Sequence, residues 1–141
     1  MDVHQTVGIL VRKGGKFLFI ERLNAPRKGW WSIPAGHVEE GETPEQAVQR
    51  EADEEVPGVS VEEYSGFTLS FETEAGERRH SENHIHETHI FFGKPPKVVR
   101  TGSDAGDFRW MTPEESLKER ITPPVKSIME WYIGSKRTGN Q

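Results

Sequence analysis

The chain has 141 residues, of which 33% are hydrophobic and 29% are charged, and we expect it to form one domain spanning residues 1–141. Its longest apolar stretch, Val7–Val11, is far shorter than the roughly 20 residues of a membrane-spanning helix. The net charge of −5 disfavours a general nucleic-acid-binding surface, and the absence of cysteine excludes disulfides and a catalytic thiol. Because the first residues lack an export signal, we expect a cytoplasmic protein.

The predicted elements begin with a β-hairpin. Thr6–Val11 and Lys16–Glu21 are rich in β-branched and aromatic residues, and Gly14-Gly15 lies between them. Trp30–Ile33 then predicts a short strand, and residues 34–36 predict a turn.

The clearest helix start in the sequence is at Thr43. Thr43 is a helix N-cap candidate, Pro44 suits the first helical position, and Gln46 completes a capping box. We expect the helix to run to about Val56. Pro57-Gly58 ends it, because proline cannot continue a helix and glycine tolerates the left-handed conformation.

The second half of the chain alternates predicted strands with turns and ends in helices. The strands are predicted at Val59–Val61, Phe67–Thr73, His84–Phe92 and Phe108–Met111, with a turn at Glu74–Glu77. Helices are predicted to begin at Thr112-Pro113 and at Thr122-Pro123. Because strands dominate without regular β-α-β alternation, the predicted fold class is α+β.

The helix that begins at Thr43 carries an acidic face. Glu51, Glu54 and Glu55 stand at i, i+3 and i+4, so their side chains share one side of the helix. The ordinary interpretation is a solvated face helped by the neighbouring Arg50. The alternative is a magnesium site, because Mg²⁺ binds a few carboxylates together with substrate phosphates.

The segment Gly36–Gly58 resembles the Nudix box, G-x5-E-x7-R-E-U-x-E-E-x-G-U, in which U is a bulky apolar residue. The fixed residues that match at the family spacing are Gly36, Glu42, Arg50, Glu51, Glu54 and Glu55. The sequence departs from the pattern at Ala52, which is small for an apolar position, and at Val56-Pro57, where the family has one residue before its last glycine. This extra residue follows the last carboxylate, so we expect it to change the helix exit and not the metal site.

Trp30–Gly36 and Phe108–Trp110 are similar to further strands of the Nudix hydrolase family. The resemblance implies a single Nudix-type α/β/α sandwich domain with a mixed β-sheet. It also implies Mg²⁺-dependent hydrolysis of a nucleoside diphosphate linked to another group X, in which water attacks phosphorus and Mn²⁺ can substitute for Mg²⁺. The implied metal ligands are the carbonyl of Ala35 and the carboxylates of Glu51, Glu54 and Glu55.

The resemblance also assigns catalytic roles. Arg50 would orient the glutamates, with Glu42 as its ion-pair partner. A late-loop acid completes the site in many family members; here Asp104 fits the usual spacing better, and Asp107 is the alternative. The base that takes a proton from the attacking water stays open between Glu51, Glu54 and the late-loop acid.

Arg22, Arg27 and Trp31 are the predicted substrate-binding residues. The planar fork of arginine suits phosphates and an indole can stack on a base, while the ordinary alternatives are a surface role for the arginines and a core role for Trp31. His84 and His86 share one strand face. No third protein ligand is evident there, so we favour a polar strand face or substrate pocket over a zinc site.

Two other functions are weighed against phosphorus attack. Residues 22–31 and 88–93 resemble segments of GDP-mannose mannosyl hydrolases, which attack a sugar carbon, but those enzymes lack a box glutamate that this chain keeps. A non-catalytic nucleotide-binding module is disfavoured by the complete acidic set. We therefore expect a small-molecule nucleotide as partner, with no stable nucleic-acid or membrane partner; a homodimer is left open.

Overall fold

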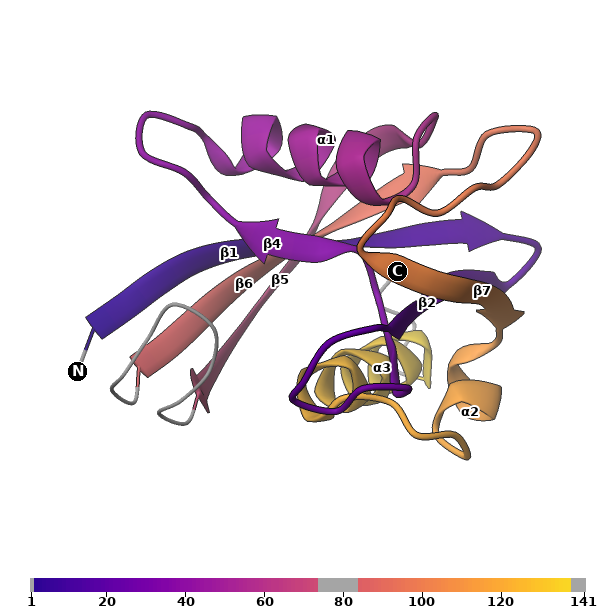
Figure 1. The fold of residues 1–141 in the computed structure, drawn as a ribbon. Helices are drawn as coiled ribbons and strands as arrows, with labels where there is room; N and C mark the ends of the chain where they lie inside the picture. Colours follow the sequence, from indigo (N-terminus) through magenta and orange to yellow (C-terminus); the bar gives the residue numbers. More distant parts are fainter. Residues whose placement is uncertain (1, 74–83, 138–141) are drawn as a thin grey trace.

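The computed structural model describes residues 2–73 and 84–137 and places helices on both faces of a mixed β-sheet (Figure 1). The strands are β1 (Asp2–Lys13), β2 (Lys16–Arg22), β3 (Trp31–Ser32), β4 (Ala35–His37), β5 (Ser60–Thr73), β6 (His84–Lys94) and β7 (Ala105–Met111). The helices are α1 (Pro44–Glu55), α2 (Pro113–Ser116) and α3 (Pro123–Arg137). Helix α1 covers one face and α2 and α3 lie on the other, which confirms the predicted α/β/α sandwich.

Strand β1 is the centre of the sheet. The sheet order is β3-β2-β1-β6-β5, with β4 also pairing with β1 and β7 with β2. The pairing of β1 with β6 is parallel, whereas its pairings with β2 and β4 are antiparallel. Residues 6–11 of β1 are all buried because both faces of the sheet are covered there.

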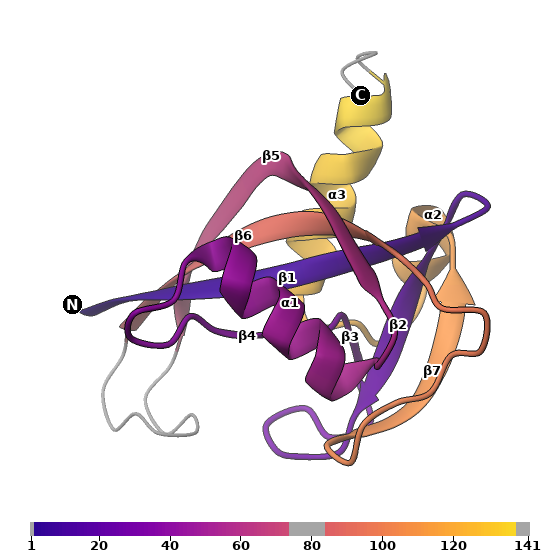
Figure 2. The same ribbon diagram turned by 90° about the horizontal axis from the view of Figure 1, so that it is seen from above.

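The side chains of β1 alternate between two hydrophobic cores. Val7, Ile9 and Val11 belong to the core beneath α1, together with Val48 and Ala52 of that helix. The neighbouring positions face the other side, where α3 packs. Seen from above in Figure 2, α1 lies across β1, so the helix is anchored on the middle of the sheet.

Helix α1 begins and ends as its sequence predicts. The Thr43 side chain accepts a hydrogen bond from the N–H of Gln46, and the Gln46 side chain accepts one from the N–H of Thr43, which completes the capping box. Val56 is the C-terminal cap, and Gly58 follows with a φ of 96°. The capping box therefore sets where the acidic face of α1 starts.

Several strands differ from their predicted bounds because pairing partners lie far away in the sequence. The two strands predicted at Val59–Val61 and Phe67–Thr73 form the single strand β5, whose register against β6 shifts twice near Tyr64. The predicted turn at residues 34–36 is wrong in part: Ala35–His37 forms β4, because Thr6, Val7 and Gly8 pair with it. The predicted turn at Glu74–Glu77 lies outside the described residues.

Strands β1 and β7 begin earlier than predicted, at Asp2 and at Ala105. Strand β1 is extended because its first residues pair with the start of β6, and β7 because Ala105 pairs with Arg22. Among the helices of the described ranges, none has the length and apolarity that crossing a membrane requires.

Candidate metal and catalytic site

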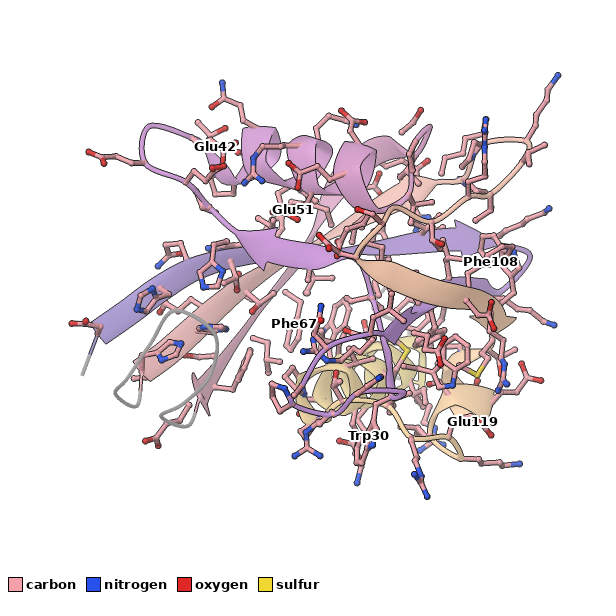
Figure 3. The ribbon with its side chains drawn as sticks, viewed as in Figure 1. Trp30, Glu42, Glu51, Phe67, Phe108 and Glu119 are labelled. Atoms are coloured by element: carbon pink, nitrogen blue, oxygen red, sulfur yellow. The ribbon has the colours of Figure 1, made fainter. Side chains whose placement is uncertain are left out.

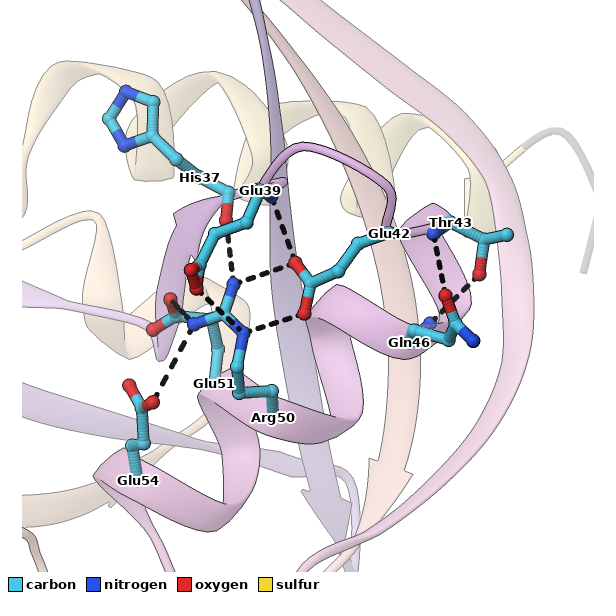
Figure 4. A network of polar contacts seen from close by, with 8 residues as sticks. All are labelled: His37, Glu39, Glu42, Thr43, Gln46, Arg50, Glu51 and Glu54. Carbon is cyan, nitrogen blue, oxygen red and sulfur yellow. Dashed lines mark hydrogen bonds and ion pairs between the residues drawn. The ribbon is translucent and has the colours of Figure 1, made fainter.

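Arg50 is the centre of the polar network on α1 (Figure 4). Its guanidinium makes a two-pronged contact with Glu42, with Nε 2.7 Å from Oε2 and Nη2 2.9 Å from Oε1. Its third nitrogen, Nη1, donates to Oε1 of Glu51 at 2.8 Å. The ion pair expected between Arg50 and Glu42 is therefore present, and the same guanidinium holds a predicted metal-binding carboxylate.

The network extends from Arg50 to the neighbouring backbone and to two further glutamates. Nη2 of Arg50 also donates to the carbonyl of His37 in β4 at 2.9 Å. Longer ion pairs of 3.4 and 3.6 Å reach Glu39 and Glu54. Arg50 thereby joins α1 to β4 and offsets the repulsion among carboxylates that share this side of the helix.

These contacts shift the pKa values of the groups they join. The hydrogen bonds from Arg50 and from the N–H of Glu39 lower the pKa of Glu42 from 4.5 to about 2. The hydrogen bond to Glu42 raises the pKa of Arg50 above its ordinary value. Burial raises the pKa of Glu51, although its hydrogen bond to Arg50 acts in the opposite direction.

Glu55 lies deepest of the three predicted carboxylate ligands. Its Oε2 accepts a hydrogen bond from the N–H of Ala35 at 2.8 Å, so helix α1 and strand β4 meet at this carboxylate. Burial, reinforced by the charge of Glu51, raises the pKa of Glu55 from 4.5 to about 8. A pKa of about 8 favours the protonated form of Glu55 at neutral pH.

Strand β4 passes close to the acidic face of α1 at Gly36. A Cβ built on Gly36 would overlap the carboxylate of Glu51, whose side chain is only 14% exposed. The absence of a side chain thus lets the strand approach the acidic face closely. Figure 3 shows Glu42 and Glu51 on the α1 side of the sheet.

The loop before β7 is fixed against the C-terminal end of α1. The N–H of Gly102 donates to the carbonyl of Glu55 at 2.8 Å, and a Cβ on Gly102 would overlap the carbonyl of Glu54. Asp104, in this loop, lies close enough to Glu55 for its charge to contribute to the raised pKa of Glu55. The N–H of Asp107 instead donates to Glu21 at 3.2 Å.

The residues predicted to bind substrate make other contacts. Nε of Arg22 donates to the carbonyl of Pro26 at 3.0 Å, within its own loop. The guanidinium of Arg27 lies 4.6 Å from the centre of the Trp30 ring.

Trp31 packs against the core on the α3 side, and the guanidinium of Arg109 lies 4.7 Å from its ring centre. Figure 3 places the neighbouring Trp30 on the α3 side of the sheet, away from Glu51. The structure therefore does not bring this loop against the carboxylates, and a substrate role for Arg22, Arg27 and Trp31 stays a prediction.

From the sequence no third ligand was evident beside His84 and His86, and the structure places two further histidines, His4 and His37, near this pair. The parallel pairing of β1 with β6 places His4 opposite His86, and the pairing of β1 with β4 brings His37 opposite Thr6. The local sequence contains no sign of this proximity, since the four histidines lie in three separate strands.

No group of three or more histidine or acidic side chains is arranged, as it stands, to hold a metal ion within residues 2–73 and 84–137. On α1 this agrees with the contacts described above, because Arg50 engages Glu51 and Glu54 while Ala35 engages Glu55. Binding a cation therefore requires these carboxylates to rotate.

The chain belongs to the NUDIX domain family, whose model matches residues 2–132. It is 32% identical over 115 residues to a MutT-like protein of Streptomyces ambofaciens, covering 81% of this chain and 66% of the relative. It is 46% identical over 55 residues to an ADP-ribose pyrophosphatase of Methanocaldococcus jannaschii, covering 38% of this chain and 32% of the relative. The chain thus spans less than two thirds of the length of either curated relative.

A solved structure shows the same fold over nearly the whole chain. The crystal structure of the MutT protein from Methanosarcina mazei Go1 matches with a TM-score of 0.79 and 22% identity, covering 99% of this chain and 97% of that one.

Replacing Gly36 should destabilise the protein. In Gly36→Ala the new methyl group displaces the Glu51 carboxylate from Arg50, at a cost of roughly 1–3 kcal/mol, typical of overpacking. The control is Gly134→Ala in α3, where a Cβ has no neighbour within 4 Å. Urea unfolding should show a lower free energy of unfolding for Gly36→Ala and no decrease for Gly134→Ala. Equal stability of wild type and Gly36→Ala would contradict the packing described.

The Glu42–Arg50 pair should make stability depend on pH in acid. Because the folded-state pKa of Glu42, about 2, is below its ordinary 4.5, the stabilisation is complete above pH 4.5 and is lost as the pH falls towards 2. The difference in unfolding free energy between wild type and Glu42→Gln should therefore shrink over that window. Glu130→Gln, an exposed change on α3, is the control; a pH-independent difference for Glu42→Gln would refute the assignment.

Proposed function

We propose that this chain is a Mg²⁺-dependent Nudix pyrophosphohydrolase that cleaves a pyrophosphate bond in a nucleoside diphosphate linked to another group X. The observation that carries the proposal is the carboxylate face of α1, formed by Glu51, Glu54 and Glu55 and held by Arg50 against β4. A family fold that places this face beside a glycine and a late acidic loop supports it.

The donor set fits a hard divalent cation. Carboxylate oxygens are the ligands that Mg²⁺ and Mn²⁺ prefer, and Glu51, Glu54 and Glu55 would supply them together with the carbonyl of Ala35. Burial raises the pKa values of Glu51 and Glu55. A bound cation would offset the repulsion between their negative charges. When bound, the ion would offset the charge of the pyrophosphate and make bound water more acidic.

Residues around the proposed ion would orient its ligands and accept a proton from water. Arg50 keeps Glu51 oriented, and the N–H of Ala35 positions Glu55. Glu54 has a side chain that is 59% exposed and only a long ion pair to Arg50, so it is the carboxylate with most freedom to meet solvent and substrate. Glu51, Glu54 and Asp104 remain the candidates for the base that accepts a proton from water.

A substrate panel tests the proposal. Nucleoside triphosphates, ADP-ribose, nucleotide sugars and dinucleoside polyphosphates should be assayed with Mg²⁺, with Mn²⁺ and with EDTA, and in ¹⁸O-labelled water. We expect hydrolysis that EDTA abolishes and either ion restores, with ¹⁸O found on a phosphate product. Label on a sugar carbon would instead support the GDP-mannose mannosyl hydrolase type of reaction. Binding without turnover of any compound would support a non-catalytic module.

Removing one charge from the exposed part of the site should abolish most turnover. We expect Glu54→Gln to lower kcat/KM by at least ~10²-fold, the range seen when an acid–base or electrostatic group is deleted, while the fold is kept. Asp53→Asn is the matched control, because Asp53 is the preceding exposed residue of α1 and accepts a hydrogen bond from Gln49. Activity of Glu54→Gln within about threefold of that control would refute the role of Glu54.

Cation binding should release a proton from Glu55. With a pKa of about 8 in the metal-free protein, Glu55 is mostly protonated at pH 7, and its carboxylate must be free to bind an ion. Mg²⁺ affinity should therefore rise with pH up to about 8. Calorimetry in buffers of different ionisation enthalpy should count close to one proton released by wild type at pH 7 and fewer by Glu55→Gln; equal release by both would contradict this.

The late-loop acid is tested by a pair of variants. Asp104→Asn should lower kcat substantially while changing Mg²⁺ affinity of the free protein less than Glu54→Gln does, because Asp104 acts from a loop and not from α1. Asp107→Asn should leave kcat near that of wild type, since its backbone is bonded to Glu21. A large loss in Asp107→Asn with a silent Asp104→Asn would assign the role to Asp107.

A further inference from the structure

Four histidines from three strands lie together on the face of the sheet opposite α1. His4 of β1, His37 of β4 and both His84 and His86 of β6 occupy positions that alternate with Val7 and its neighbours beneath α1. His84 and His86 are 2% and 7% exposed, and the Nε2 atoms of His4 and His37 are buried as well. The carboxylate site plays no part in this cluster.

The rings of the four histidines are close neighbours. The ring centres of His84 lie 4.7 Å from both His4 and His86, and those of His37 and His86 are 5.1 Å apart. The remaining separations given by the structure are 5.9 Å for His4–His37 and 6.1 Å for His4–His86. Nε2 of His84 and Nε2 of His86 form a hydrogen bond of 2.8 Å, in which the tautomers decide which ring donates.

Three of these separations are close to those of imidazoles around a tetrahedral ion, and the two that involve His4 with His37 and with His86 are longer. With metal–nitrogen distances of about 2.0–2.1 Å, each ring centre lies about 3.2 Å from the ion, and two ring centres lie about 5 Å apart. The coordinating nitrogens would be about 3.3 Å apart, so the His84–His86 pair has to open by about 0.5 Å and to move the proton of its hydrogen bond from Nε2 to Nδ1 of the donating ring. The other two rings must turn as well, because the described side chains do not surround a common point as they stand.

We propose that this histidine cluster is a second metal site, which binds a zinc-class transition-metal ion through imidazole nitrogens. Neutral imidazole suits Zn²⁺, Co²⁺, Ni²⁺ and Cu²⁺, whereas Mg²⁺ prefers the oxygen donors of the carboxylate face. The two sites therefore select different ions. This proposal does not rest on the proposed hydrolase activity.

The position of the cluster indicates a structural role. An ion there would join β1, β4 and β6. His37 provides a link to the carboxylate site, because its carbonyl accepts the hydrogen bond from Arg50 on the other side of the same short strand. A bound ion would therefore hold β4, which carries Ala35 and Gly36, in place.

Cobalt titration of the full chain without an affinity tag tests the proposal. In excess Mg²⁺, Co²⁺ should give a visible absorption band typical of nitrogen ligation with one equivalent bound. His84→Ala and His86→Ala should weaken Co²⁺ binding by at least about 100-fold. Changing a residue that only supports a metal ligand already lowers metal affinity by up to about 100-fold, and these variants remove a ligand itself. His89→Ala is the matched control, because His89 lies on the same strand, faces the other side and bonds to Thr68 and Gln5.

Two further measurements distinguish this metal site from the carboxylate face and from simple packing. Glu54→Gln should retain the cobalt band, which separates this site from the carboxylate face. Zn²⁺ should raise the melting temperature of wild type and of His89→Ala but not of His4→Gln, a milder change at the half-buried edge of the cluster. No cobalt band in wild type, or an unchanged band in His86→Ala, would overturn the proposal and would assign the cluster to packing between imidazole rings.

Discussion

The contact between Arg50 and Glu42 is the constraint on which the candidate site depends. A helix face with three glutamates is unfavourable by itself, since each like-charge pair costs roughly 0.2–0.5 kcal/mol. Arg50 offsets this repulsion from a partly buried position, and Glu42 fixes the guanidinium in the orientation that reaches Glu51. The hydrogen bonds from Arg50 to Glu42 and Glu51 join charged groups, which makes them shorter and stronger than hydrogen bonds between neutral groups.

Close backbone approach is the second condition for the site. Gly36 brings β4 against Glu51, and Gly102 brings the late loop against the end of α1. Both segments then bond to the residue at the end of the helix: Ala35 to the Glu55 side chain and Gly102 to the Glu55 carbonyl. The acidic face is thus clamped between a strand and a loop that are far apart in the sequence.

Local sequence was sufficient to predict the features that depend on local chemistry. The capping box at Thr43 and the extent of α1 follow from residue types at short spacings. The pairing of Arg50 with Glu42 followed instead from the resemblance to the Nudix box. The α/β/α class followed from the Nudix box, because that motif is tied to one fold.

Features that depend on distant pairing could not be predicted. Strand β4 exists because Thr6 and its neighbours offer it a partner, and the parallel pairing of β1 with β6 joins residues more than 80 positions apart, as the Thr6–Thr88 hydrogen bond shows with its separation of 82. The histidine cluster follows from the same two pairings. For the same reason, the sequence could not tell that the Trp31 ring packs on the α3 side.

We have proposed that the carboxylate face of α1 is the metal site of this Nudix domain. Anomalous X-ray diffraction from crystals soaked in Mn²⁺ tests it most directly, because the ion is located without reference to activity. We expect an anomalous peak within about 2.0–2.2 Å of carboxylate oxygens of Glu51, Glu54 or Glu55, with the Ala35 carbonyl among the ligands. A well-occupied Mn²⁺ peak elsewhere, with this face empty, would contradict the account.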